Sequence, residues 1–403
     1  MKAVMYGAGN IGRGFIGALL SQAGYHVSFI DVAEPVIRAL QENGRYPVRY
    51  VSTGGHEDVW VENVTAVDGR NPDAVAQAIA ECDIMATAVG ARVLEIIVPH
   101  IVRGLRRRWE SGRAPLNILI CENLMDAADV LRGMIIRLLT EQEAAIFSET
   151  VGLVETSIGR MVPVQTEAMK DGEPLRVCVE RYGFLPVDRD AFRSPVPAIP
   201  NLYPASPFDF FVRRKLYLHN MAHAVCAYLG GYAGKAYIWE AIEDPDVFII
   251  VQNAMLESAA ALAKQYDVPL SGLLTHADDL LCRFRNRALM DTCARVGGDP
   301  VRKLGANDRL IGTMQMIAGS GGIPVWTPIG AAGALYRYLQ ESGVEQTDEN
   351  ALSALASLAG LTAEQPHTEP VLAMYRLFRR GESPAAMRRA ALERKEAFAG
   401  NIL

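Results

Sequence analysis

The sequence lacks the cysteine patterns that stabilise secreted domains or hold metal ions. Its six cysteines are scattered along 403 residues, with no C-x-x-C pair and no grouping with histidine. Scattered thiols are typical of a chain that stays reduced inside the cell, and a structural zinc site needs closely spaced cysteine and histidine ligands. We therefore expect no disulfide framework, no metal and a cytoplasmic location.

Long apolar runs and a surplus of positive charge are missing as well. The first residues lead at once into glycines, so we expect no signal peptide, and no apolar run approaches the length of a membrane span. The chain has 40 lysines and arginines against 46 aspartates and glutamates, so its net charge of −6 does not support nucleic acid or an anionic membrane as a partner. The composition is typical of a soluble globular protein with two or three domains.

What is present begins with a dinucleotide-binding pattern near the amino terminus. Lys2-Ala3-Val4-Met5-Tyr6 has the apolar character of a buried strand, and Gly7-Ala8-Gly9-Asn10-Ile11-Gly12 leads from it into a helical pattern. Gly7 allows the tight turn, Gly9 lets the backbone approach a pyrophosphate, and Gly12 permits close packing of the helix on the strand. The free N–H groups at the start of the helix then face the phosphates. The alternative is a glycine-rich turn in some other α/β protein.

The second predicted strand indicates which dinucleotide is bound. Val27-Ser28-Phe29-Ile30 ends in Asp31, about 20 residues after the glycines, the usual separation in this motif. An acid at this place binds the ribose hydroxyls of NAD and would repel the 2′-phosphate of NADP. We therefore expect NAD as the cofactor.

Two later predicted strands end in residues that would border the cofactor. The run 84–90 reads as a buried strand that ends in small residues, which places Ala88 and Val89 beside the nucleotide. The run 118–121 delivers Asn123 at its carboxyl end, and ligands of open α/β sheets bind outside the carboxyl ends of the strands. Asn123 is therefore a candidate for the nicotinamide or substrate side. The alternative is an ordinary turn asparagine.

The remaining patterns give the architecture. Residues 46–67 are β-rich and predict a hairpin inserted in the wound sheet. Six prolines between residues 186 and 207 exclude a helix interior or a central strand, so we place the domain boundary after residue 195. The predicted fold class is α/β, with a Rossmann-type doubly wound domain over 1–195 and a mostly α-helical domain over 196–403. Helices of the second domain are predicted over 237–242, 247–266, 273–288, 328–339, 350–358 and 370–378.

The stretch from Arg214 to His223 carries the candidate catalytic residues. On a helix with 100° per residue, Lys215, His223 and Asn220 lie at roughly 0°, 80° and 140°, on one arc. An amine, an imidazole and an amide on one side could accept a proton, orient the acceptor and hold a developing alkoxide, as alcohol oxidation requires. Spacing alone leaves open a solvated helix face with a chance lysine and histidine.

Together these motifs resemble those of the polyol-specific long-chain dehydrogenases, the mannitol dehydrogenase family. The resemblance rests on G-A-G-N-I-G-R-G-F-I-G at residues 7–17, C-E-N at 121–123 and R-K-L-x-x-x-N-x-x-H-A at 214–224. It covers the chain from residue 1 to at least residue 309. It is strongest toward members that act on mannitol 1-phosphate.

The resemblance implies an NAD-dependent oxidoreductase that interconverts mannitol 1-phosphate and fructose 6-phosphate without a metal. Lys215 corresponds to the general base, and His223 corresponds to the residue that positions the reacting oxygen. Asn123 and Asn220 correspond to the amides that hydrogen-bond this oxygen and stabilise its charge. The alternatives are a relative that acts on an unphosphorylated polyol or a hexuronate, and a sensor that binds NAD without turnover. Members are often monomeric, and we expect a monomer.

A sugar phosphate needs cations to bind its phosphate. Arg302, Lys303 and Arg309 offer two guanidinium forks and one ammonium within a glycine-rich segment. The alternative is that Arg309 pairs with nearby acids and that Lys303 is merely solvated. Two positions also depart from the family pattern: Gly159 stands where relatives often have aspartate, and His219 stands where leucine is usual.

Overall fold

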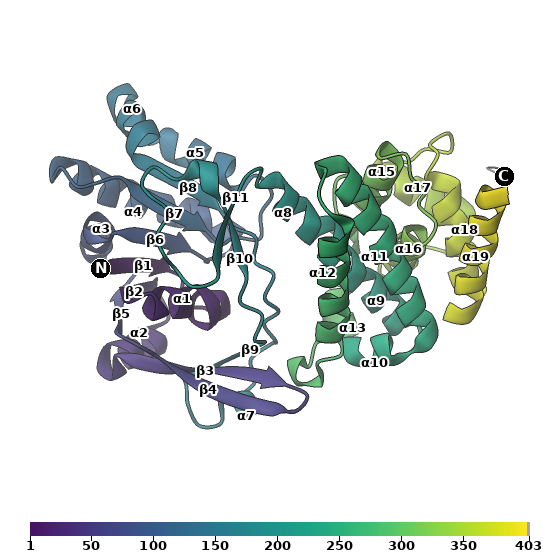
Figure 1. The fold of residues 1–403 in the computed structure, drawn as a ribbon, viewed down its shortest axis with the longest axis horizontal. Coiled ribbons are helices and arrows are strands. Elements are labelled where there is room, and N and C mark those ends of the chain that lie inside the picture. Colours follow the sequence, from purple (N-terminus) through teal and green to yellow (C-terminus); the bar gives the residue numbers. More distant parts are fainter. Residues whose placement is uncertain (401–403) are drawn as a thin grey trace. The chain divides into compact units, whose positions relative to one another are not determined.

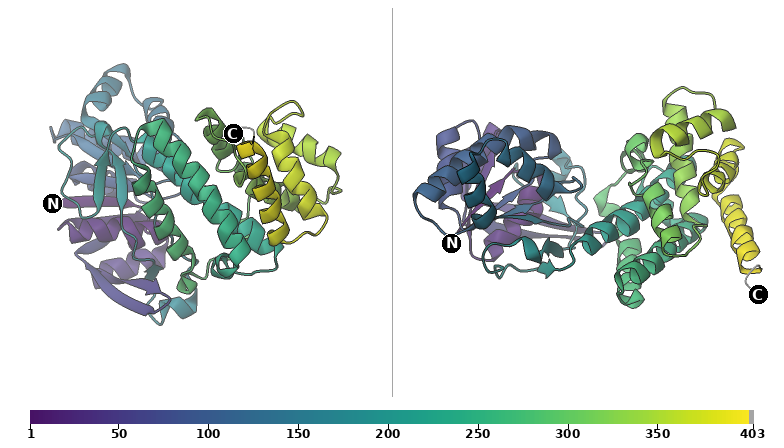
Figure 2. Two further views of the ribbon diagram at one scale, coloured as in Figure 1. Left: turned by 45° about the vertical axis from the view of Figure 1, so that its right-hand side comes forward. Right: turned by 90° about the horizontal axis from the view of Figure 1, so that it is seen from above.

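The computed structural model describes residues 1–400, and the chain forms two compact units, Met1–Asp209 and Phe210–Leu403. The first unit is a sheet with helices, and the second is helical (Figures 1 and 2). This is the predicted class, a Rossmann-type domain followed by a mostly helical one. The domain boundary after residue 195 stays a prediction of the sequence.

The first unit is built on a six-stranded parallel sheet. Its strands lie in the order β5-β2-β1-β6-β7-β8, and Tyr6 at the end of β1 is paired with Ile30 on one side and Thr87 on the other. The strand order reverses between β1 and β6, where a doubly wound sheet binds its ligand at the carboxyl edge. The strands are β1 (Lys2–Tyr6), β2 (His26–Asp31), β5 (Val64–Asp68), β6 (Ile84–Thr87), β7 (Leu116–Ile120) and β8 (Val151–Glu155).

Two apolar cores cover the two faces of this sheet. Side chains alternate along a strand, so Val4 and Met5 of β1 belong to different cores. Val4 packs in the core with α3, α4 and α5, and Met5 packs in the core with η1, α1 and a smaller sheet. The helices of this unit are η1 (Gly12–Ile16), α1 (Gly17–Gln22), α2 (Glu34–Asn43), α3 (Pro72–Glu81), α4 (Ala91–Glu110), α5 (Ala127–Ile136), α6 (Glu141–Thr150), α7 (Glu167–Lys170) and η2 (Arg189–Ala191).

The predicted insertion is a hairpin, but it is shorter than expected. β3 (Arg45–Ser52) and β4 (Gly55–Glu62) pair antiparallel, and β9 (Val177–Val179) joins β3 in parallel. The expectation that residues 64–67 belong to this hairpin was wrong, because they lie in β5 of the main sheet. One apolar β-branched pattern runs through both elements, and only Asn63, with a left-handed φ of 59°, separates them. The remaining strands are β10 (Leu185–Asp188) and β11 (Leu202–Ala205).

The second unit is centred on α9 (Met221–Tyr232). Nine of its twelve residues are buried, and α10, α11, α13 and α16 pack around it. α11 (Pro245–Tyr266) is long and apolar enough to cross a membrane by length and composition, but it packs against α9, α10, α12 and α15. Half of its apolar window is buried inside the protein, as in a core helix.

All six helices predicted for this unit are present. They are α10 (Ile238–Glu243), α11, α12 (Leu270–Phe284), α16 (Thr327–Glu341), α17 (Asp348–Ala359) and α18 (Thr368–Arg379). The sequence did not predict several shorter or less periodic elements. These are η4 (Arg287–Leu289), α13 (Cys293–Val296), α14 (Pro300–Lys303), α15 (Ile311–Gly319) and α19 (Pro384–Gly400).

Candidate active site

The glycine-rich turn joins β1 to the helix that follows it. Gly7 has a φ of +102°, and a Cβ there would lie 2.5 Å from the carbonyl oxygen of Ala88, so this turn requires glycine. A Cβ on Gly12 would lie 1.9 Å from the carbonyl oxygen of Gly7, so Gly12 lets the turn close on itself. Gly17 also lets this helix pack closely on a strand, because a Cβ there would meet the ring of Phe29 in β2.

Gly9 differs from these glycines, because the packing of the chain does not require it. A Cβ on Gly9 would meet no heavy atom within 4 Å, and its backbone is not left-handed. The next two residues, Asn10 and Ile11, start the helix, Asn10 exposed and Ile11 half-buried. Open space over Gly9 at the start of a helix is what a pyrophosphate needs in order to approach the backbone. The turn therefore fits a dinucleotide.

Asp31 ends β2 and binds three backbone N–H groups. Its Oδ2 accepts a hydrogen bond from Ala8 (2.7 Å), and its Oδ1 accepts from Val32 (2.8 Å) and Ala33 (3.0 Å). A carboxylate has about four acceptor positions, so it keeps capacity for a ribose hydroxyl. Asp31 thus has a second role that sequence reasoning missed, since it ties β2 to the glycine-rich turn.

Glu122, which sequence reasoning also missed, joins the ends of β6 and β7. Its buried carboxylate accepts hydrogen bonds from the N–H groups of Val89 (3.0 Å) and Gly90 (2.8 Å). The residue before Val89 is Ala88, whose N–H donates a hydrogen bond to the last residue of β1. Asn123, the residue after Glu122, is exposed beyond the end of β7. The cofactor residues predicted in the first unit and Asn123 therefore all lie at the carboxyl ends of β1, β2, β6 and β7.

Lys215, Asn220 and His223 lie on a continuous helix that contains a π-helical turn. The π-helix η3 (Lys215–Asn220) follows α8 (Asp209–Arg214) and continues into α9. With about 4.4 residues in a π-turn and about 3.6 in an α-turn, Asn220 and His223 lie at roughly 50° and −10° from Lys215. The expected spread of about 140° assumed an α-helix throughout, so the π-turn brings the three side chains into a narrower arc. π-helices occur frequently at functional sites.

His223 faces the buried carboxylate of Asp291. Its Nε2 lies 3.1 Å from Asp291 Oδ2, and its ring stacks on Phe284 at 4.8 Å between centroids. Asp291 also accepts hydrogen bonds from Arg295 at 2.5 and 2.8 Å. Burial raises the pKa of Asp291, but His223 and Arg295 outweigh it and hold the pKa below its usual value. An ionised Asp291 therefore fixes the His223 ring from one side.

The three cations predicted to bind phosphate all have partners within the protein. Arg302 and Arg309 each donate to an aspartate close in sequence, in both cases at 2.7 Å. Lys303 is 5% exposed and donates to the carbonyl oxygen of Gly298. Burial, followed by Arg309 and Arg302, lowers the pKa of Lys303 to about 8. Arg309 therefore pairs with a nearby acid, which was the alternative to phosphate binding. Lys303 is not solvated, as that alternative supposed, but buried.

Two family models together match most of the chain. The mannitol dehydrogenase Rossmann domain matches residues 1–201, and the mannitol dehydrogenase C-terminal domain matches residues 208–382. The chain belongs to the mannitol dehydrogenase family. Within residues 1–400, the structure groups no three His, Cys, Asp or Glu side chains as possible ligands of a metal ion.

Solved structures of other dehydrogenases have the same fold as this family member. A D-sorbitol dehydrogenase in substrate-free form is 15% identical, with a TM-score of 0.78 over 97% of this chain and 94% of that chain. A Pseudomonas fluorescens mannitol 2-dehydrogenase, in a ternary complex with NAD and D-mannitol, is 15% identical, with a TM-score of 0.76 over 98% and 94%. At this identity the likeness concerns the fold.

The structure also accounts for the two departures from the mannitol dehydrogenase pattern. A Cβ on Gly159 would lie 3.0 Å from the ring of Tyr182, so an aspartate there would require this ring to move. His219 is 6% exposed, and its ring centroid lies 6.2 Å from those of His223 and Phe284. Burial and then neighbouring cations lower the pKa of His219 well below its usual value, so it packs beside the candidate site as a neutral ring.

Proposed function

We propose that this member of the mannitol dehydrogenase family is an NAD-dependent oxidoreductase that interconverts mannitol 1-phosphate and fructose 6-phosphate. The π-turn that gathers Lys215, Asn220 and His223 carries the proposal, because it supports a base, an amide donor and an imidazole on one arc. The open space over Gly9 supports the dinucleotide. When bound, NAD supplies the nicotinamide ring that accepts or returns a hydride.

In the proposed reaction, Lys215 Nζ accepts the proton of the reacting hydroxyl. Asn220 donates a hydrogen bond to the same oxygen and stabilises its negative charge, and the family motif assigns Asn123 this role as well. His223 orients the oxygen. A lysine base requires a pKa close to neutrality, and in proteins burial or a neighbouring positive charge lowers the pKa of a lysine. Lys215 and Arg283 both contribute to the lowered pKa of His219, so the two cations share one neighbourhood.

Asp291 is expected to act on the reaction through His223. Asp291→Asn should lower kcat by roughly 10- to 100-fold with little change in KM, a loss of the size caused by removing a carboxylate that orients a metal-bound histidine. Steady-state kinetics and the melting temperature should be compared with Asp279→Asn, which removes a half-exposed carboxylate bound to Arg283. An Asp291→Asn variant that loses melting temperature but keeps its kcat would reduce Asp291 to a structural residue.

Binding of the substrate's phosphate should depend on Arg302, Lys303 and Arg309. Each alanine variant should lose about tenfold or more of the preference for fructose 6-phosphate over fructose in kcat/KM, since a hydrogen bond to a charged group is lost. The exposed Arg380→Ala, at the end of α18, is the control. Equal losses on both sugars would assign these residues to the polyol chain and favour the unphosphorylated substrates.

This preference should also depend on pH. Because the pKa of Lys303 is lowered to about 8, its positive charge is present below this pH and is lost as the pH rises through 8. The wild-type ratio of kcat/KM for fructose 6-phosphate to that for fructose should therefore fall between about pH 7 and pH 9. In the Lys303→Ala variant, the part of this fall that is due to the loss of the Lys303 charge should be absent.

Asp31 is expected to select NAD over NADP. Asp31→Ala should lower kcat/KM for NADH more than for NADPH, because the 2′-phosphate no longer meets a carboxylate. The substitution should also weaken the binding of both cofactors, because the glycine-rich turn loses the hydrogen bond that the N–H of Ala8 donates to Asp31. Asp83→Ala, at the opposite end of β6, is the control. Comparable kcat/KM values for NADH and NADPH in the unmodified protein would contradict this assignment.

A further inference from the structure

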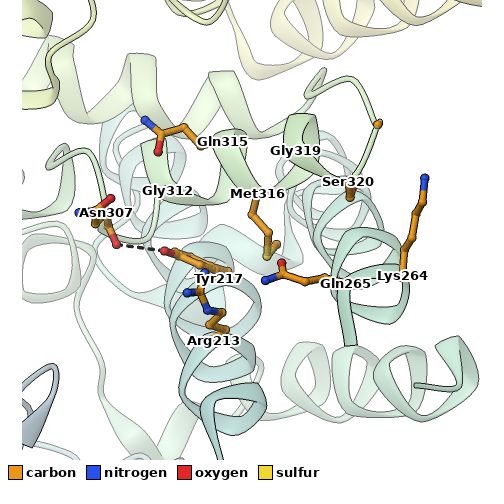
Figure 3. A pocket seen from close by; sticks show the side chains of 11 residues that line it. Arg213, Tyr217, Lys264, Gln265, Asn307, Gly312, Gln315, Met316, Gly319 and Ser320 are labelled. Carbon is orange, nitrogen blue, oxygen red and sulfur yellow. Dashed lines mark hydrogen bonds between the residues drawn. The ribbon is translucent and has the colours of Figure 1, made fainter. Parts of the chain in front are cut away.

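A polar pocket lies within the second unit, and none of the residues assigned to catalysis lines it. It has a volume of about 710 Å³ and is formed by α8, η3, the end of α11 and the segment around α15 (Figure 3). Tyr217 of η3 forms part of its wall and lies roughly 160° around the π-turn from Lys215. Its polar side chains include those of Arg213, Lys264, Gln265, Asn307 and Gln315, which lie around Tyr217.

The lining of this pocket is cationic and rich in hydrogen-bonding groups. Arg213 and Lys264 carry positive charge, and Gln265, Asn307 and Gln315 supply carboxamides. None of its eleven lining residues, all in the described part of the chain, is acidic. Guanidinium and ammonium groups bind phosphate oxygens, and carboxamides match the mixed donors and acceptors of sugar hydroxyls. The volume falls within the range of about 300–1,000 Å³ that small-molecule sites occupy.

Tyr217 connects this pocket to the π-turn. Its hydroxyl donates to the carbonyl oxygen of Asn307 (3.2 Å), and its own carbonyl oxygen accepts from Ser258 Oγ (2.6 Å). A Cβ on Gly312 would lie 2.9 Å from the Tyr217 ring, so α15 packs directly against this ring. Figure 3 shows Arg213, Gln265 and Met316 arranged around Tyr217. A ligand in the pocket would therefore contact the same helical turn that carries the candidate base.

We propose that this pocket binds a small phosphorylated sugar or polyol at a site separate from the reacting one. The phosphate lies between Arg213 and Lys264, and the hydroxyls bind the carboxamides. Bound in this way, the ligand holds Tyr217 and with it the π-turn. The site is therefore placed to adjust the reaction without taking part in it.

The test is calorimetric titration of the full chain with glucose 6-phosphate in the absence of NADH. Lys264→Ala removes a pocket cation, and Gln315→Glu adds a negative charge at the pocket; both side chains are exposed, so the fold should persist. We expect each variant to raise the Kd about tenfold or more, as for a lost or opposed contact with a charged group. Lys235→Ala, a partly exposed lysine outside the pocket, should bind like the wild type.

Arg302→Ala distinguishes the proposed pocket from the substrate's own phosphate site. Under the proposal it binds glucose 6-phosphate like the wild type, because Arg302 does not line the pocket. Wild-type affinity in Lys264→Ala and Gln315→Glu would overturn the proposal, whatever Arg302→Ala does. Absence of binding to the unmodified protein at millimolar glucose 6-phosphate would overturn it as well.

Discussion

Lys215→Ala should lower kcat by a factor of about 10²–10⁴ while NADH still binds, since general base catalysis contributes this much. Without the amine, no group in the assigned set accepts the hydroxyl proton as the carbon is oxidised. The glycine-rich turn and Asp31 belong to the first unit, so the binding of the cofactor should be unaffected.

The loss at Lys215 must be separated from a loss of fold. Lys235→Ala removes a partly exposed lysine from the same unit and should keep the wild-type kcat. Fluorescence titration with NADH and the melting temperature should agree between the two variants. If Lys215→Ala keeps more than about a tenth of the wild-type kcat, Lys215 is not the base.

Asn220→Ala should lower kcat by about 10²–10³-fold, which is the typical effect of removing one donor to a developing oxyanion. Asn220 stands at the N-cap of α9, but its side chain makes no capping hydrogen bond, so its removal should leave the helix stable. Asn123→Ala, at the exposed end of β7, should show the same kinetic pattern.

The control for Asn220→Ala is Asn253→Ala, which removes a partly buried amide from α11 of the same unit. Its kcat should match that of the wild type. A change in Asn220→Ala that is confined to KM would show that the amide binds the ground state and the transition state equally. Asn220 would then be a binding contact, and the charge on the oxygen would be stabilised by another group.

Short sequence patterns were sufficient to predict the glycine-rich turn and several of the helices. The glycines at 7, 9 and 12 follow a strand at the spacing of a dinucleotide-binding turn, and Asp31 ends the next strand. The six helices predicted for the second unit were found from their apolar period. α15 was missed because it is apolar on nearly all sides and therefore lacks this period.

The geometry of the candidate site depends on contacts that the sequence does not reveal. The carbonyl oxygen of Tyr217, inside the π-turn, is bound by the hydroxyls of Ser258 and Thr313, which lie 41 and 96 residues away. Nothing in the local sequence distinguishes this π-turn from an ordinary α-helical turn. Asp291 meets His223 across 68 residues by the fold alone, so no motif connects them.

The most direct test of the proposed function is the rate of NADH oxidation by the unmodified protein with four acceptors. Fructose 6-phosphate, fructose, tagaturonate and fructuronate should be compared side by side at one pH. We predict the highest kcat/KM for fructose 6-phosphate, by about tenfold or more over fructose if the phosphate is bound by charged groups. A higher value for one of the other three would identify an unphosphorylated or hexuronate substrate, and no oxidation with any of them would contradict the proposed reaction.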